Sequence, residues 1–206
     1  FKERMRRAVT EYEESGRIYE SDRDMRKVRC DAFAALAEYW LESQSSEKKA
    51  VLERCWKLTK QVLKGFEEAG NAVDYGKTFN ELSASVDLGY FFHETFQTRE
   101  KIIREALEYG EDAIKFLSTV GDRLELSRAY AKTATYRDMF TYYFAGQEDR
   151  GKYHQKATDY WLKAKNISEE TAMLELPSVL LGCGPDGYWG CGTDSAISNF
   201  ERALEC

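Results

Sequence analysis

Residues 98–122, TREKIIREALEYGEDAIKFLSTVGD, decide the fold, because their pattern occurs three times in the chain. Moved back by 51 residues, the stretch lies on KKAVLERCWKLTKQVLKGFEEAGN, and moved forward by 51 it lies on GKYHQKATDYWLKAKNI. A fixed period of this size is typical of proteins built from repeated structural units. The matched positions are Gly70 and Gly121; Cys55, Ala106 and Ala157; Val62, Ala113 and Ala164; and Tyr109 and Tyr160.

The composition favours an ordered, helix-rich soluble protein. The 206 residues are 43% apolar and 32% charged and include only two prolines, and a chain of this length buries on the order of 70% of its unfolded surface. No apolar run approaches the roughly 18 to 20 residues that span a bilayer, so no membrane contact is expected. The chain begins at Phe1 rather than methionine, which suggests a fragment of a longer protein.

The charges and cysteines point to a cytoplasmic protein that does not bind nucleic acid. Residues 1–167 hold 29 basic and 29 acidic side chains, and the net charge of −6 comes from residues 168–206. A balanced, interspersed charge pattern is typical of a solvated helical surface rather than a phosphate-binding one. Of five cysteines, Cys30 and Cys55 occupy apolar positions of helical patterns, where a reduced thiol behaves as a small hydrophobe.

Apolar spacing and capping residues predict a series of helices broken near 21–22, 44–46, 70–71, 96–98, 121–122 and 145–147. Ser45-Ser46 and Thr98 are the expected N-caps, and Gly70-Asn71 and Gly121-Asp122 the expected C-caps. Ser168-Glu169-Glu170 is expected to restart a helix that Pro177 ends. The predicted helices cover 2–19, 22–41, 45–69, 72–96, 98–120, 124–144 and 148–167, followed by an irregular glycine-rich loop at 182–193 and a C-terminal helix at 194–205.

The two helices of each hairpin carry different repeated patterns. The first helices share four positions. A large residue is followed three positions later by a medium-sized residue, then directly by a small one, and a second medium-sized residue comes three positions after that. The second helices place a small residue seven positions before another small or β-branched one, which lets neighbouring helices approach closely. We therefore expect Ala106, Ala113, Ala134 and Ala164 to be buried. The first-helix sets are Cys30, Phe33, Ala34 and Ala37; Phe79, Leu82, Ser83 and Val86; and Tyr130, Thr133, Ala134 and Arg137.

Over residues 2–167 these repeated residue patterns resemble those of the tetratricopeptide repeat (TPR) superfamily, with a period of about 50 residues in place of 34. The resemblance implies an all-α fold: a right-handed αα-hairpin solenoid of about eight to nine helices, with residues 1–206 as a single domain. The alternative is an irregular helical bundle whose hairpins merely look alike.

No motif in the chain predicts catalysis, a cofactor or a metal. GCGPDGYWGCG at 182–192 contains a dinucleotide-like glycine spacing, but Pro185 interrupts it and no strand precedes it. Cys183 and Cys191 are too far apart in sequence for a zinc knuckle, and we expect free thiols. His93-Glu94 lacks the second histidine of a zinc-protease helix, and His154 is interpreted as a surface or boundary residue.

The resemblance also implies a peptide-binding concave face lined by the first helices. Small residues recur there at Ala35, Ala84 and Thr135, beside a column of three acids, Glu38, Asp87 and Asp138. Such a surface would admit a segment carrying Lys or Arg, although three acids in an acidic chain also coincide by chance. The candidate peptide-binding residues are Asp31, Glu38, Tyr39, Lys77, Asn80, Asp87, Arg128, Thr135 and Asp138.

The sequence thus favours a non-catalytic scaffold that binds a protein or peptide, without cofactor or metal. One alternative is the sensor or regulatory arm of a multidomain signalling ATPase, which the unpaired first helix would suit. A second is a small-molecule-binding helical enzyme, which the 13 tyrosines and four tryptophans would suit. Most of these aromatic residues fall at core spacing, which favours the scaffold.

Overall fold

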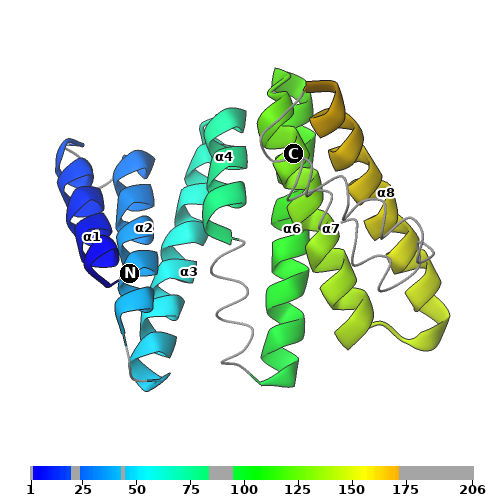
Figure 1. Ribbon diagram of the computed structural model, residues 1–206, viewed down its shortest axis with the longest axis horizontal. Helices are drawn as coiled ribbons and strands as arrows, with labels where there is room; N and C mark the ends of the chain where they lie inside the picture. The colour runs from blue at the N-terminus through cyan, green and yellow to red at the C-terminus, as the bar shows by residue number, and fades with distance from the viewer. Residues whose placement is uncertain (1, 20–23, 43–44, 84–94, 172–206) are drawn as a thin grey trace. The chain divides into compact units, whose positions relative to one another are not determined.

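The computed structural model describes residues 2–19, 24–42, 45–83 and 95–171 (Figure 1). Within them the chain forms seven α-helices and one π-helix, and no strand. The chain divides into two compact units, Phe1–Ile102 and Ile103–Cys206, each with its own core. The expected all-α class is confirmed. The expected loop at 182–193, the helix at 194–205, and Cys183 and Cys191 lie outside the described residues.

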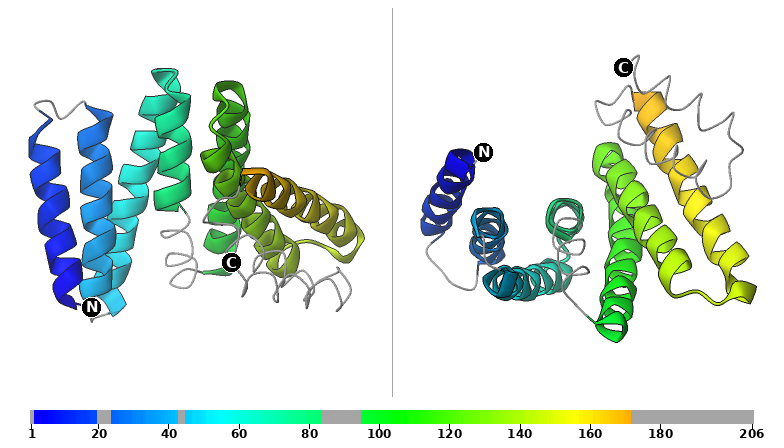
Figure 2. Two further views of the ribbon diagram at one scale, coloured as in Figure 1. Left: turned by 45° about the horizontal axis from the view of Figure 1, so that its top comes forward. Right: turned by 60° about the horizontal axis from the view of Figure 1, so that its bottom comes forward.

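Unit 1 is a series of helices in which each contacts the next. It contains α1 (Lys2–Arg17), α2 (Met25–Leu41), α3 (Ser45–Glu68) and α4 (Ala72–Thr78), which continues into the π-helix η1 (Phe79–Ser83). α1 packs on α2, α2 on α3 and α3 on α4, and Figure 2 shows α1 and α2 side by side from two further directions. The largest fully buried side chains of this unit are Tyr75, Phe79, Leu52, Leu63 and Leu82.

Unit 2 is built from three long helices. α6 (Phe96–Val120) enters this unit at Ile103, and α7 (Arg123–Tyr143) and α8 (Gln147–Thr171) follow, packed along one another. Ala134, Trp161 and Ala164 form a buried cluster between α7 and α8. Because two of these three residues are alanines, the helix backbones come close and the Trp161 ring fills the remaining space.

The connection from α3 to α4 and the connection from α6 to α7 have the same turn structure, 51 residues apart. Gly70 and Gly121 adopt φ values of 65° and 75°, a left-handed conformation that favours glycine at the end of a helix. The next residue then caps the following helix: the Asn71 side chain accepts a hydrogen bond from the Asp74 N–H, and Asp122 accepts one from the Glu125 N–H. Asn71 and Asp122, expected to end helices, therefore begin them.

Burial follows the period of 51. Cys55, Ala106 and Ala157 each have no exposed surface, and neither do Val62, Ala113 and Ala164. Ala134 is equally buried, so the predicted burial of the four alanines is confirmed. The second helix of each of these hairpins therefore has two positions at which a small side chain lets a neighbouring helix pack closely.

Two predicted helix starts, at Thr98 and at Ser168, are wrong. Thr98 lies inside α6, and the Thr95 hydroxyl instead accepts a 3.4 Å hydrogen bond from the Thr98 N–H. Ser168 does not restart a helix, because α8 continues through it to Thr171. Its hydroxyl is fully buried and lies 2.7 Å from the Ser127 hydroxyl of α7. A serine that faces a neighbouring helix has its hydrogen bonds there and is not available as a cap.

Replacing Ala106 by leucine tests whether these small residues set the helix spacing. The added atoms have no free volume, so the free energy of unfolding should fall by about 1–3 kcal/mol, measured by urea denaturation. Ala50→Leu is the matched control, because Ala50 is exposed on α3. Equal stability of the two variants would contradict close packing at Ala106.

Candidate functional site

A cavity of about 280 Å³ opens in unit 2 between the end of α7 and the beginning of α8. The connection between the two helices is short: the N–H groups of Phe144 and Ala145 both bond the Phe140 carbonyl, and the Asp149 N–H bonds the Gly146 carbonyl. This tight turn brings the last turns of α7 against the first turns of α8. The residues that line the cavity, called the α7–α8 pocket below, are Asp138, Thr141, Tyr142, Arg150, Gly151 and His154.

Asp138 is the fixed acidic group of the pocket. The Trp161 indole donates a 3.0 Å hydrogen bond to Asp138 Oδ2, and His154 Nδ1 lies 3.8 Å from Oδ1. The Asp138 side chain is 20% exposed. Since an indole N–H only donates, it holds the carboxylate in one orientation without neutralising its charge.

Aromatic side chains form the rim beside it. Tyr142 and Tyr143 are 50% and 42% exposed, and their rings meet edge to face with centroids 4.7 Å apart. The Tyr143 ring lies 6.1 Å from the Phe144 ring, and Phe140 lies 5.9 Å from Phe144 and 5.0 Å from Tyr153, between ring centroids. Ring contacts therefore connect the exposed tyrosines to the packed aromatic residues around the α7–α8 connection.

Arg150 is held at the turn. Its Nε donates a 3.3 Å hydrogen bond to the Ala145 carbonyl, and the residue is exposed. The Thr141 hydroxyl donates to the Arg137 carbonyl at 2.7 Å, within its own helix. Among the polar lining residues, Asp138 and His154 are 20% and 25% exposed and Thr141 is also half-buried, whereas Arg150 is exposed.

The expected peptide-binding residues of unit 1 lie on α2, α4 and η1. Glu38 forms an ion pair with Arg54 of α3, and Tyr39 packs on Trp40 with Lys48 over its ring. Asn80 is buried, and Ala35 has no exposed surface, so neither offers area to a ligand. Asp31 and Lys77 are half-buried. Asp87 and Ala84 lie outside the described residues.

The expected residues of unit 2 lie along α7. Arg128 forms a 2.9 Å ion pair with Glu125, and the Thr135 hydroxyl donates to the Ala131 carbonyl at 3.1 Å. Of the eight candidates that the structure describes, Asp138 alone lines the pocket. Glu38 and Asp138 belong to different units, so the continuous acidic column stays a prediction.

Sequence reasoning missed the other pocket residues. His154, interpreted from the sequence as a surface or boundary residue, is 25% exposed and lines the pocket with Asp138. The adjacent Tyr142 and Tyr143 and a glycine inside a helical pattern at Gly151 were the available signals.

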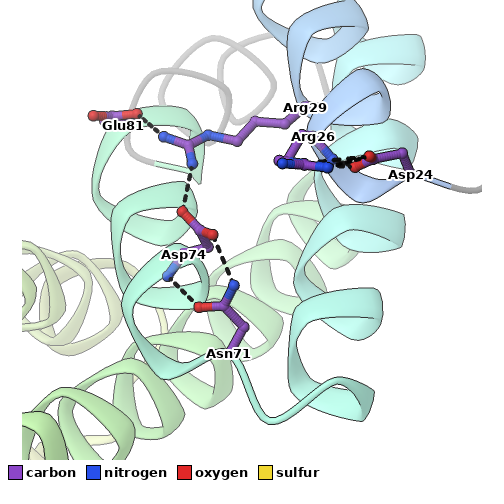
Figure 3. A network of polar contacts seen from close by, with 6 residues as sticks. All are labelled: Asp24, Arg26, Arg29, Asn71, Asp74 and Glu81. Carbon is purple, nitrogen blue, oxygen red and sulfur yellow. Dashed lines mark hydrogen bonds and ion pairs between the residues drawn. The ribbon is translucent and has the colours of Figure 1, made fainter. Parts of the chain in front are cut away.

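A polar network connects α2 to α4 and η1 in unit 1 (Figure 3). Arg29 of α2 reaches Asp74 of α4 at 3.3 Å and Glu81 of η1 at 2.8 Å, and its side chain is 19% exposed. The Asn71 amide donates to Asp74 Oδ2 at 2.7 Å. A guanidinium with several donors can bridge two carboxylates in this way, so we interpret the network as structural: it holds α2 against α4 and η1.

Asp24 begins α2 and belongs to the same view (Figure 3). Its carboxylate accepts hydrogen bonds from the Arg26 guanidinium and from the Arg26 N–H. These bonds stabilise the charged form and hold the pKa of Asp24 below its usual value. The carboxylate caps the helix, which leaves it a structural role.

Glu111 makes the equivalent connection in unit 2. This residue of α6 pairs with Arg137 of α7 and accepts a 2.5 Å hydrogen bond from the Tyr160 hydroxyl of α8. Arg137 lies 5.2 Å from the centre of the Tyr160 ring. Burial, and then the bond to Glu111, raise the pKa of Tyr160 to about 12.

The raised Tyr160 pKa predicts a late-titrating tyrosine. An ordinary tyrosine ionises near pH 10, so this contact stabilises the fold fully below about pH 10 and ceases to do so as pH rises through 12. Absorbance at 295 nm followed against pH should show a tyrosine step near pH 12 that is absent from Tyr160→Phe. Superimposable curves for the two proteins would contradict the Glu111 contact.

The described residues form neither a metal-binding cluster nor a membrane-spanning helix. No group of three or more His, Cys, Asp or Glu side chains there is arranged to hold a metal ion. None of the helices in the same residues combines the length and apolar character needed to cross a membrane. Comparisons of the chain with protein-family models, with curated proteins and with solved structures gave no match.

Proposed function

We propose that the chain is a non-catalytic, TPR-like helical-repeat module that binds a segment of another protein, and that the α7–α8 pocket is one of its contact sites. The repeat reading is supported by the glycine corners at Gly70 and Gly121 and by burial that recurs every 51 residues. We further propose that the hairpins form a right-handed solenoid. Proteins of this architecture present extended surfaces to other chains.

The observation that carries the proposal is an open pocket beside two exposed tyrosines on rigid helices. Tyr142 and Tyr143 are each more than 40% exposed. Tyrosine gives a large contact area for little conformational entropy, and it is enriched where binding energy concentrates. A cavity of about 280 Å³ falls just below the range of pockets for drug-sized ligands, about 300–1,000 Å³, and suits one side chain.

The geometry of the pocket does not favour catalysis. Thr141, His154 and Asp138 are the residue types of a nucleophile, a base and an orienting acid. The His154–Asp138 separation of 3.8 Å exceeds a hydrogen bond, and the Thr141 hydroxyl donates to a helix carbonyl. The members of a triad are typically linked by hydrogen bonds of about 2.6–3.2 Å, which can be longer before a substrate binds. Binding is the function that these distances support.

Selection of random 12-residue peptides by display on the full chain tests the proposal. One or more sequence families should be enriched, and a synthetic member should bind with a measurable Kd. Tyr142→Ala combined with Tyr143→Ala should weaken binding at least tenfold, equivalent to about 1.4 kcal/mol.

Trp40→Ala is the matched control, because Trp40 of α2 is an aromatic residue of the same 50% exposure in the other unit. This variant should bind the selected peptide as the unchanged protein does. Absence of any enriched family would refute protein-segment binding. Equal losses in the tyrosine variant and in Trp40→Ala would refute the assignment to the pocket.

A further inference from the structure

We infer that the α7–α8 pocket is a subsite for one cationic side chain, lysine or arginine, of the bound segment. The inference rests on the proposed function and adds the chemistry that the pocket selects. Three independent features of the pocket support it. They are the burial and fixed orientation of the Asp138 carboxylate, the neighbouring Tyr142 ring, and the absence of a side chain at Gly151.

Asp138 provides an oriented negative charge within the pocket wall. Its side chain is 20% exposed, and Trp161 fixes one of its oxygens at 3.0 Å. A carboxylate that is largely removed from water is attracted more strongly to an incoming cation than an exposed one. The indole hydrogen bond fixes its direction before the ligand arrives, which lowers the entropic cost of binding.

Arg150 also lines the pocket, and its positive charge weakens this attraction only in part. Arg150 is exposed and held towards the turn by its bond to the Ala145 carbonyl, so solvent screens its charge more than that of Asp138. His154 carries charge only when protonated. The Tyr142 ring lines the same pocket, and an aromatic face beside a carboxylate is a favourable surrounding for an ammonium or guanidinium group.

Gly151 leaves the mouth of the pocket without a side chain. It lies inside α8, where glycine costs about 1 kcal/mol relative to alanine. A Cβ at this position would meet nothing within 4 Å, so helix packing does not require glycine there. At Gly65, by contrast, a Cβ would overlap the Met25 side chain. The space beside Gly151 is therefore available to a ligand.

Small-molecule probes test the charge preference without a known partner. Acetylated, methylamide-capped arginine and lysine are titrated into the ¹⁵N-labelled full chain, with capped citrulline and norleucine as uncharged counterparts of similar shape. The Trp161 indole N–H, assigned by Trp161→Phe, reports on the pocket because it bonds Asp138. We expect a saturable shift with the cationic probes and at least tenfold weaker binding of the neutral ones.

Two substitutions localise the effect by different mechanisms. Asp138→Asn removes the charge while its amide oxygen still accepts the indole hydrogen bond, and it should weaken cation binding at least tenfold. Gly151→Leu should block the mouth, whereas Gly151→Ala is the matched control and should retain binding and stabilise α8. Dispersed spectra of all three variants establish that they are folded.

The outcomes separate this inference from the proposed function. If neutral probes bind as well as cationic ones, or if Asp138→Asn leaves affinity unchanged, the cationic subsite is refuted. Selected peptides that still bind through Tyr142 and Tyr143 would then leave the proposed function standing. If the cationic probes bind but no peptide family is enriched, the pocket chemistry is supported and protein-segment binding fails.

Discussion

Close approach of helices at small side chains is the constraint on which the structure depends. Cys55, Ala106 and Ala157, and again Val62, Ala113 and Ala164, are fully buried at intervals of 51 residues. A larger residue at these points would separate the helices and uncover the aromatic and aliphatic side chains that fill the spaces beside them, as Trp161 does between α7 and α8. Small positions therefore set the spacing, and large positions supply most of the buried apolar area.

Polar ties then connect helices within each unit. Arg29 bridges α2 to α4 and η1, and Glu111 of α6 receives both Arg137 and Tyr160. Each of these connections uses the guanidinium of a mostly buried side chain, which is 19% exposed at Arg29 and 10% exposed at Arg137. Because such groups destabilise any packing that leaves them unpaired, they favour the observed arrangement of helices over close alternatives. A rigid α7–α8 pair is what holds Asp138 and Tyr142 in place at the pocket.

Local signals made much of the fold predictable, and long-range packing decided the rest. The corners at Gly70 and Gly121 and the buried alanines followed from the repeat, because a positive φ and a close helix approach each demand a particular residue type. The role of Ser168 and the wider turn of η1 depend on neighbouring helices, which no local pattern shows. The repeat alignment predicted Asp138 as a peptide-binding residue, but His154 and Gly151, which line the same pocket, come from the next helix, across a turn.

The proposed entry of a cationic side chain into the α7–α8 pocket can be tested in a complex. A crystal structure of the chain with a peptide obtained by selection measures this most directly. The account predicts a lysine or arginine nitrogen within about 3 Å of an Asp138 carboxylate oxygen, with its aliphatic stem against Tyr142 and beside Gly151. A peptide bound on another surface, or an apolar side chain filling the pocket, would contradict it.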